Sequence, residues 1–534
     1  MLFRSILSGL TSVADWVGPQ NDRFFGYQQQ PLTTRRYAEL AGAKARTSLE
    51  HLGWIGWRPN GETKTFAEAF SYLGFGELRP VQQAVIECAM TQASPTMFII
   101  EAPTGIGKTE LALYIADQWL QREAGRGLYV AMPTQATSNQ MFTRVGEFLH
   151  RRYPDMPINY HLVHGQAAWL DELKQQVELQ GVGDDGQAHL IAENWFGPRK
   201  RTLLAPFGVG TVDQTLLSVL QTKHFFVRLF GLSHKVVIFD EVHAYDTYMN
   251  TIFHLLLSWL NAIGTSVIIL SATLPASTRQ ALVKAYAGKE LSVTELVYPA
   301  LTIANTERCQ TMALPKPESY PLEIDRNVER APDAIVQFLR GELVKGGYAA
   351  VICNTVGRAQ EVYRALDTAR QRGDILIDEA NLILFHGAFP PVWRKEIEQT
   401  VLQKFGKGGE RQGSAIVVAT QVIEQSLDID FDLMITDLAP IDLLLQRAGR
   451  LHRHAVNDMH RHGLPRRLVI TKPALCDNGA PNFDVETNIY DEYTLFRTYL
   501  VLQGRDRISI PDDMTGLIEA VYDSDYSMTL PSGI

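Results

Sequence analysis

The sequence is poor in cysteine and has no excess of positive charge. Its four cysteines among 534 residues form no CxxC pair, which argues against a zinc site and a disulfide framework and suits a reducing, cytoplasmic setting. The formal net charge of −9 excludes a chain that is basic throughout, so a surface for nucleic acid must be local. A hydrophobic share of 46% is ordinary for a globular chain, and the length suits several domains.

Long apolar runs are also missing. Residues 247–278 carry no Asp, Glu, Lys or Arg, but Asn250, His254 and Gly264 interrupt the run. Arg4 interrupts the apolar N-terminus, which makes a signal peptide a poor interpretation. We therefore expect no membrane segment and interpret 247–278 as a buried helix followed by a buried strand.

Short β-rich runs recur along the chain, with helical patterns between them. Continuous apolar strands that alternate with helices predict an α/β fold with parallel sheets covered by helices. The runs lie at 96–105, 127–134, 235–241, 266–273, 348–356, 381–387, 414–421, 433–438 and 466–472. A Pro-rich stretch predicts a linker. The expected parts are a short N-terminal segment (1–62), a first domain (63–300), the linker (301–330), a second domain (331–475) and a short C-terminal segment (476–534) to which periodicity assigns no fold.

EAPTGIGKTE, residues 101–110, follows one of these strands and opens a helix. Backbone N–H groups in such a loop wrap phosphates, and the helix N-terminus adds positive potential. Lys108 would reach the β and γ phosphates of a nucleotide, and the Thr109 hydroxyl would hold Mg²⁺. The usual pattern has a glycine where this chain has Ala102, and a Gly-rich turn without a ligand is the alternative. The loop itself contributes Thr104, Gly105 and Gly107.

KVVIFDEVHAYD, residues 235–246, is a buried strand that ends on two acids. A phosphate loop needs a second strand end to complete a magnesium site, and Asp240 would hold Mg²⁺ through water. Glu241 would polarise the attacking water. A solvated acidic turn is the alternative. His243 and Tyr245 are either packing residues or a link from the nucleotide site to the rest of the domain.

GFGELRPVQ and SAT are weaker signals. Phe75 would stack on adenine and Gln82 would read its edge, but a helix that begins with a proline explains the same residues. Ser271 and Thr273 end the next strand. They carry weight only because they follow the other motifs in order.

QRAGRLHRH, residues 446–454, places three arginines at intervals of three. On a helix, Arg447, Arg450 and Arg453 would share one face and would repel one another without an anion. A transition-state phosphate is such an anion, and an exposed basic face is the alternative. Glu424 and Asp428, which come earlier, suit a ribose or an arginine.

These motifs in this order, over about 66–475, resemble a superfamily 2 helicase. DEVHAYD, PTQATSNQM (133–141), VGTVDQTLL (209–217) and QSLDIDFD are similar to the CRISPR-associated type I helicase–nuclease family. The resemblance implies two tandem RecA-like domains, ATP and Mg²⁺ as ligands, and recruitment by an RNA-guided surveillance complex. It also implies movement 3′ to 5′ along single-stranded DNA.

The resemblance assigns roles by position. It implies ATP binding or hydrolysis by Gln82, Gly105, Gly107, Lys108, Thr109, Asp240, Glu241, Asp428, Gln446, Arg450 and Arg453. It implies coupling of hydrolysis to movement by Ser271 and Thr273. It implies contacts with the DNA backbone by Thr134, Gln135, Thr211, Asn354 and Thr420.

Two departures from the family pattern concern the nuclease and the C-terminus. The family's HD nuclease domain needs His and Asp ligands, but no His precedes His51, and Asp15 alone falls where a ligand would. We expect a helicase that does not cut DNA by itself, with a separate HD nuclease as a further partner, and a chain that lacks much of the family's C-terminal domain. The alternatives are an RNA helicase or other DNA translocase of the superfamily, and an inactive docking module.

Overall fold

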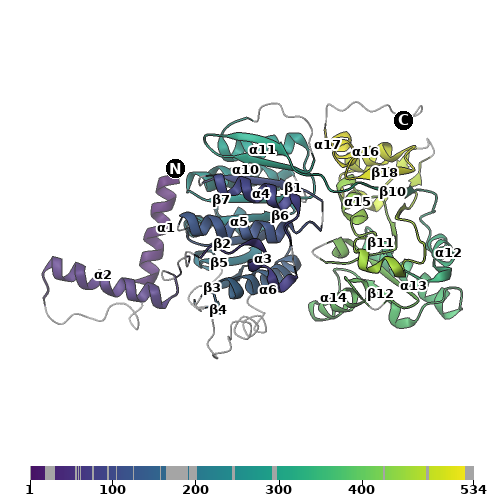
Figure 1. Ribbon diagram of the computed structural model, residues 1–534, viewed down its shortest axis with the longest axis horizontal. Helices are drawn as coiled ribbons and strands as arrows, with labels where there is room; N and C mark the ends of the chain where they lie inside the picture. Colours follow the sequence, from purple (N-terminus) through teal and green to yellow (C-terminus); the bar gives the residue numbers. More distant parts are fainter. Residues whose placement is uncertain are drawn as a thin grey trace. The chain divides into compact units, whose positions relative to one another are not determined.

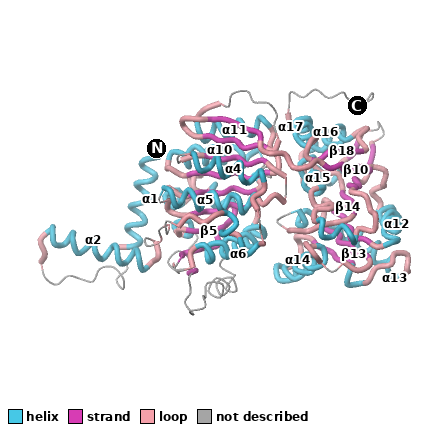
Figure 2. Tube along the Cα trace, viewed as in Figure 1, coloured by secondary structure: helices cyan, strands magenta, loops and turns pink. Residues whose placement is uncertain are grey.

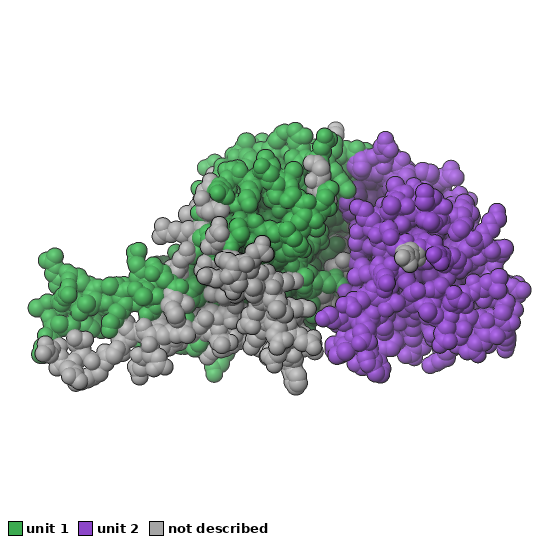
Figure 3. Space-filling model, turned by 60° about the horizontal axis from the view of Figure 1, so that its bottom comes forward, with its two compact units in different colours: residues 1–102, 106–316 green, residues 103–105, 317–534 purple. Residues whose placement is uncertain are grey.

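The computed structural model describes residues 2–18, 31–54, 57, 59, 62–74, 77–92, 95–103, 105–123, 125–154, 156, 158–163, 190–191, 201–242, 247–290, 298–409, 411–424, 427–476 and 480–523. The chain forms two compact units (Figure 3). The first contains residues 1–102 and 106–316, and the second contains residues 103–105 and 317–534.

The first unit is built on a sheet that is mostly parallel. Among the described residues its strand order is β4–β3–β5–β2–β6–β7–β1–β8–β9. Of the strand pairs in the described part of this sheet, only β1–β8 and β8–β9 are antiparallel. The bounds are β1 (Met97–Glu101), β2 (Leu128–Met132), β3 (Ile158–Val163), β4 (Leu190–Ile191), β5 (Phe207–Thr211), β6 (Val236–Asp240), β7 (Ser266–Ser271), β8 (Ala300–Ala304) and β9 (Cys309–Ala313).

Helices cover both faces of this sheet (Figures 1 and 2). Alternate residues of β1 pack on opposite faces: Phe98 and Ile100 join one apolar core, and Met97 and Ile99 join the other. Burial on both faces explains why these strands are continuous apolar runs. The helices are α1 (Leu2–Val17), α2 (Thr34–His51), α3 (Phe66–Ala69), α4 (Pro80–Thr91), α5 (Lys108–Glu123), α6 (Gln135–Arg152), α8 (Val212–Leu216), α9 (Phe225–Leu232), α10 (Thr247–Ala262) and α11 (Ala276–Ala287), with short 3₁₀ turns η1 (Ser71–Leu73) and η4 (Thr202–Leu204).

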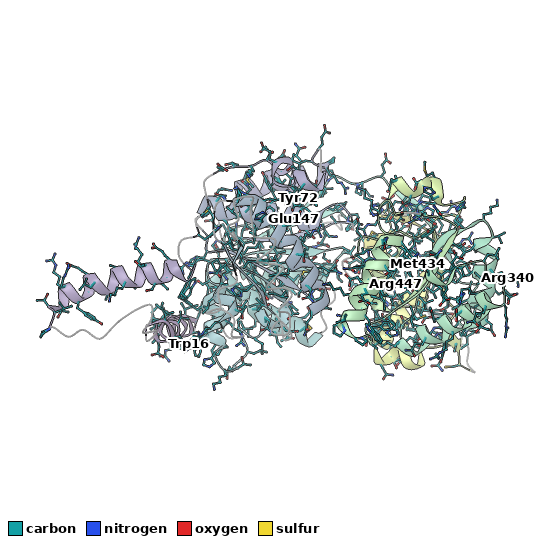
Figure 4. The ribbon with its side chains drawn as sticks, turned by 90° about the horizontal axis from the view of Figure 1, so that it is seen from below. Trp16, Tyr72, Glu147, Arg340, Met434 and Arg447 are labelled. Carbon is teal, nitrogen blue, oxygen red and sulfur yellow. The ribbon has the colours of Figure 1, made fainter. Side chains whose placement is uncertain are left out.

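Helix α1 packs against α9 at close range. A side chain on Gly9 would place its Cβ 2.6 Å from the carbonyl oxygen of Phe226, so the approach requires a glycine. Further along α1, the Trp16 ring lies edge-on to His224 with 5.4 Å between the ring centroids (Figure 4). The N-terminal segment is therefore anchored on the first unit.

The second unit has its own sheet, with the order β12–β13–β11–β14–β15–β10–β18 among the described residues. The described neighbours are all parallel except β10 and β18. The bounds are β10 (Tyr320–Asp325), β11 (Gly347–Ile352), β12 (Leu382–Phe385), β13 (Ser414–Ala419), β14 (Leu433–Thr436), β15 (Arg467–Ile470) and β18 (Arg507–Ile510). Both sheets confirm the predicted fold class of tandem RecA-like domains.

The remaining elements of the second unit include the C-terminal segment, whose fold the sequence did not predict. Its strand β18 extends the sheet by pairing with β10. The elements are α12 (Pro332–Glu342), η6 (Leu343–Lys345), α13 (Val356–Gln371), η7 (Glu379–Asn381), α14 (Pro391–Phe405), η8 (Gln421–Glu424), α15 (Ile441–Ala448), η9 (Ala455–His460), β16 (Ala474–Leu475), β17 (Pro481–Asn482), η10 (Asp484–Asn488), α16 (Glu492–Leu502) and α17 (Met514–Tyr522).

Half of the stretch 301–330, which was expected to be a linker, is strand. It contains most of β8 and all of β9 and β10, and the boundary between the units falls inside it, between 316 and 317. Its prolines cluster in and near the irregular connection 314–319, and that short connection alone has the character that the composition predicted. Within the described parts of the chain, no helix is both long and apolar enough to cross a membrane.

Candidate functional site

The predicted phosphate loop lies where a parallel strand passes into a helix. Strand β1 ends at Glu101 and α5 begins at Lys108. Gly105 and Gly107 have φ angles of 84° and 79°, which favour glycine over any residue with a Cβ. The Lys108 ammonium group donates a hydrogen bond to the Ala102 carbonyl oxygen at 2.6 Å, so its side chain folds back over the loop. Thr109 lies in the first turn of α5, and Thr104 falls outside the described residues.

The buried Gln82 side chain holds this loop in place through two hydrogen bonds. Its Oε1 accepts a hydrogen bond from the Arg79 backbone N–H at 3.0 Å, and its Nε2 donates one to the Ile106 carbonyl at 3.0 Å. A Cβ on Gly107 would lie 2.8 Å from that Nε2, which explains the glycine. The helix that begins with a proline is therefore present, as α4. Recognition of adenine by Gln82 stays a prediction, and Phe75 lies outside the described residues.

The two acids of the second motif sit at the end of β6. Asp240 is the last strand residue, and Glu241 adopts a left-handed backbone with φ 55°, which turns the chain sharply after the strand. Burial raises the pKa of Asp240 to about 7, and the charge of Glu241 adds to this, while Lys108 and Arg144 oppose it. A cation at this position would favour the carboxylate form. His243 and Tyr245 fall outside the described residues.

Strand β7 joins the two motifs at one edge of the sheet. It runs parallel to β1 and β6, with Ser271 opposite Glu101 and Leu270 opposite Asp240. The carboxyl ends of the three strands therefore meet, and the loop after β1, the SAT turn and the acid pair lie together. The Ser271 hydroxyl donates a hydrogen bond to the Thr273 carbonyl oxygen at 2.8 Å.

A buried ion pair fastens the SAT turn to the phosphate-loop strand, and the sequence did not predict it. The Glu101 carboxylate accepts from Arg279 Nε at 2.6 Å and Nη2 at 3.1 Å, and from the Leu274 backbone N–H at 3.0 Å. Both charged side chains are buried. An acid at the end of an apolar strand was the only signal in the sequence, and its partner lies 178 residues away.

Loss of this pair should destabilise the first unit. Glu101→Gln leaves a buried guanidinium without its counter-charge, so we expect the free energy of unfolding to fall by about 3 kcal/mol. Glu290→Gln is the matched control, because Glu290 pairs with Lys284 at the surface and an exposed pair contributes at most ~1 kcal/mol. Urea unfolding followed by fluorescence measures both. Equal stability of the two variants would contradict the structural role of Glu101.

Helix α6 is tied to the helix that follows the phosphate loop. Buried Glu110, in the first turn of α5, forms an ion pair with Arg144 of α6. Thr134 caps the start of α6, with its hydroxyl accepting from the Thr137 backbone N–H at 3.3 Å, and Gln135 is the first helical residue. Both expected DNA-contact residues at this helix start are partly exposed, whereas Thr211, at the start of α8, is buried.

Asn354 and Thr420 lie at strand ends of the second sheet and are buried. Asn354 follows β11 and is 2% exposed, and its amide donates to the Leu438 carbonyl at 2.8 Å. Thr420 follows β13, and its backbone N–H donates to the Phe385 carbonyl at 3.2 Å. In this conformation Asn354 connects two strand ends, and its contact with DNA stays a prediction.

The arginine motif does not lie on one helix face, so that prediction was wrong. Helix α15 ends at Ala448, and the chain after Gly449 turns to pair with the preceding loop through a bridge between Phe431 and Leu451. Only Arg447 is helical. It is fully buried, and its Nε donates to Glu424 Oε1 at 2.6 Å.

The other two arginines lie in the turn beyond α15. Arg450 Nη1 donates to the Leu427 carbonyl at 2.7 Å, and Nη2 donates to the Glu424 carbonyl. Arg453 Nε lies 3.1 Å from Asp428 Oδ1, and its side chain is 18% exposed. Asp428 was expected to bind either a ribose or an arginine, and in the structure its partner is an arginine, Arg453. Gln446 is half-buried on α15.

Asp430 holds this turn in place, a role that the sequence did not predict. Its buried carboxylate accepts the backbone N–H of Arg453 at 2.8 Å and of His454 at 3.4 Å, and forms an ion pair with Arg461 at 3.0 Å. Burial raises the pKa of Asp430, but hydrogen bonds from Arg461 and Asn457 outweigh it, and the net pKa is lowered. Asp430 therefore fixes the backbone from which the Arg453 side chain extends.

Asp15, expected at a position of the family's nuclease site, is exposed on α1. Among the described residues, no group of three or more His, Cys, Asp or Glu side chains is arranged to hold a metal ion. Mg²⁺ bound to a nucleotide needs only one or two protein carboxylates besides phosphate oxygens and water. Asp240 with the Thr109 hydroxyl is a donor set of that kind.

Two family models match the chain. The model described as DEAD/DEAH box helicase matches residues 79–282, and the one described as CRISPR-associated nuclease/helicase Cas3, C-terminal, matches residues 345–456. The chain is 40% identical to a CRISPR-associated endonuclease/helicase Cas3 of Thermus thermophilus, over 98% of this chain and 60% of that protein. It is 32% identical to the Escherichia coli protein of the same description, over 97% and 58%. The chain thus spans about 60% of the length of these relatives.

The chain is also similar to solved structures of this family. The structure described as T. fusca Cas3-ATP superimposes with a TM-score of 0.80 at 32% identity, covering 98% of this chain and 60% of that one. A chain in a CRISPR RNA-guided surveillance complex, pre-nicking, has a TM-score of 0.71 at 32% identity, covering 98% and 58%.

Proposed function

The chain belongs to the CRISPR-associated helicase–nuclease family and holds its superfamily 2 helicase portion, and from this premise we propose that it is an ATP-driven translocase on single-stranded DNA. The observation that carries the proposal is the sheet edge of the first unit. There a glycine loop at a helix N-terminus, the SAT turn and the Asp240–Glu241 pair lie together. These features together can bind and hydrolyse a nucleoside triphosphate.

The phosphate loop and the residues at the end of β6 supply the binding and base functions. The phosphates bind to the loop backbone and to Lys108, which exchanges its hydrogen bond with Ala102 for them. Asp240 and Thr109 hold Mg²⁺, which neutralises phosphate charge when bound. Glu241, which follows the end of β6 in a left-handed backbone conformation, orients and deprotonates the attacking water.

The second unit supplies positive charge and contacts for nucleic acid. Arg450 and Arg453, with Gln446, stabilise the transferred phosphate, because arginine provides a fixed positive charge for the transition state. Asp428 serves the same site by orienting the Arg453 guanidinium, with which it forms an ion pair at 3.1 Å. The DNA backbone is contacted by Thr134, Gln135, Thr211, Asn354 and Thr420. Hydrolysis is coupled to movement by Ser271 and Thr273. The family relationship supports these roles.

The proposed partners follow from the relatives. A similar chain is described in an RNA-guided surveillance complex, which supports recruitment of this chain by such a complex. Movement 3′ to 5′ along the displaced strand, and a separate HD nuclease that cuts it, complete the proposal.

The test is ATP hydrolysis with matched strands of DNA and RNA. We expect single-stranded DNA to raise the rate and added salt to weaken this effect, because contacts with a phosphate backbone are electrostatic. The DNA should remain intact in the same reaction. Equal stimulation by RNA would instead support an RNA helicase, and binding to a surveillance complex without any ATP hydrolysis would support a docking module.

A further inference from the structure

The C-terminal segment reaches into the candidate site of the second unit through one hydroxyl group. Tyr490 follows η10, and its hydroxyl oxygen accepts hydrogen bonds from Gln421 Nε2 at 3.1 Å and from Arg447 Nη2 at 3.4 Å. The two donors belong to different motifs, since Gln421 begins η8 and Arg447 lies on α15. One oxygen atom therefore connects two elements of the site.

The Gln421 side of this connection leads to the proposed DNA contacts. Gln421 directly follows Thr420 at the end of β13. Its Nε2 also donates to the Asn354 carbonyl oxygen at 2.9 Å, so one amide group touches both Asn354 and Tyr490. A shift of the strand ends on DNA binding would move this amide.

The Arg447 side leads to the proposed phosphate-binding arginines. Arg447, labelled in Figure 4, is fully buried and also donates to the Asp437 carbonyl at 3.2 Å. Its partner Glu424 offers its backbone carbonyl to Arg450. A change at Arg447 is therefore passed to Arg450 through a single residue.

The Tyr490 hydroxyl suits the role of a shared acceptor. Burial raises the pKa of Tyr490, so the group stays neutral over the physiological range and accepts from both donors without a charge change. Deleting the oxygen leaves a buried guanidinium and an amide each short of one partner, and such groups are costly to leave unmatched.

We propose that the Tyr490 hydroxyl is a positioning group that couples the DNA-contact end of the second unit to its phosphate-binding arginines. DNA binding then accelerates ATP hydrolysis partly through Gln421, Tyr490 and Arg447. The inference rests on the proposed function and deepens it, because it assigns the C-terminal segment a part in regulation of the same site.

Tyr490→Phe tests this by removing one atom. We expect the ratio of DNA-stimulated to basal ATP turnover to fall by about threefold to tenfold, the size expected for one buried hydrogen bond. The thermal unfolding midpoint should fall by no more than about 4 °C, the shift expected for the loss of about 1 kcal/mol in a unit of this size. Tyr493→Phe is the matched control on the neighbouring helix, since Tyr493 is 60% exposed and its hydroxyl accepts a hydrogen bond only from Arg497 among the described contacts. Its ratio should stay that of the wild type.

Two outcomes separate this inference from the proposed function. A wild-type chain whose ATP turnover does not respond to DNA overturns the proposed function itself. A wild-type chain that responds, with an unchanged ratio in Tyr490→Phe, overturns only the coupling role.

A double-mutant cycle with Gln421→Met gives an independent measurement, which also decides the matter if Tyr490→Phe lowers the unfolding midpoint. If both side chains act through the same hydrogen bond, the double variant should lose no more stimulation than the more impaired single variant. Losses that multiply would show that Tyr490 does not act through Gln421, and the proposal would be wrong.

Discussion

Glu241→Gln should bind ATP with unchanged affinity and hydrolyse it at least ~10²-fold more slowly, the scale of a missing general base. The amide preserves the size of the side chain and the left-handed turn at this position, but it cannot accept a proton from water. Binding of a fluorescent ATP analogue and steady-state phosphate release measure the two effects separately.

Glu147→Gln is the control for this experiment. Glu147, labelled in Figure 4, lies on α6 of the same unit and forms an ion pair with Arg151 near the surface. Its turnover should match that of the wild type. Near-normal turnover in Glu241→Gln would show that another residue is the general base. Loss of nucleotide binding would show that Glu241 contributes to binding ATP before the reaction.

The central strands of both sheets were predictable because each is buried on both faces. Apart from Asp240 at the end of β6 and Ser414 at the start of β13, these two strands are continuous runs of apolar residues, and such runs have few other stable environments. Strand β5 (Phe207–Thr211) escaped prediction because two of its five residues are glycine. Strand β10 escaped because it contains Pro321, which composition associates with a linker.

Local motifs predicted the loop and the acid pair of the site, but not the contacts that hold them. A phosphate loop is defined by about eight consecutive residues, so the sequence contains it whole. The Glu101–Arg279 pair and the bonds of Asp430 to the turn after α15 join residues far apart in the chain. Such pairs arise from the topology of the sheet, which fixes which strand ends meet.

The arginine motif shows where helical spacing misleads. Spacing by three predicts a common face only if the helix continues, and here it ends at Ala448. After the helix, the backbone pairs with the loop around Phe431 instead. The Phe431 N–H donates to the Arg450 carbonyl at 2.9 Å, and the His452 N–H donates to the Phe431 carbonyl at 3.0 Å. Tertiary hydrogen bonds therefore override the local helical preference.

Arg453→Ala should produce the largest loss, on the order of 10³ in ATP turnover, as for other arginines that stabilise a transferred phosphate. Nucleotide affinity should change little, because the ground state is held by the phosphate loop and Lys108. Arg453→Lys should restore only part of the rate, since an ammonium group lacks the planar guanidinium geometry. Single-turnover hydrolysis and equilibrium nucleotide binding provide the measurements.

Arg453 is a better probe than Arg450 for a structural reason. Arg450 donates to two backbone carbonyls, so Arg450→Ala would disturb the loop before α15 as well as remove a charge. The Arg453 side chain bonds to exposed Asp428, and Asp430 holds its backbone whatever the side chain is. Arg340→Ala, at a surface arginine that is 62% exposed and labelled in Figure 4, is the control for charge loss and should keep normal turnover. Full activity in Arg453→Ala would remove this arginine from the mechanism, and an equal loss in Arg340→Ala would show that net charge, not a placed guanidinium, is what hydrolysis requires.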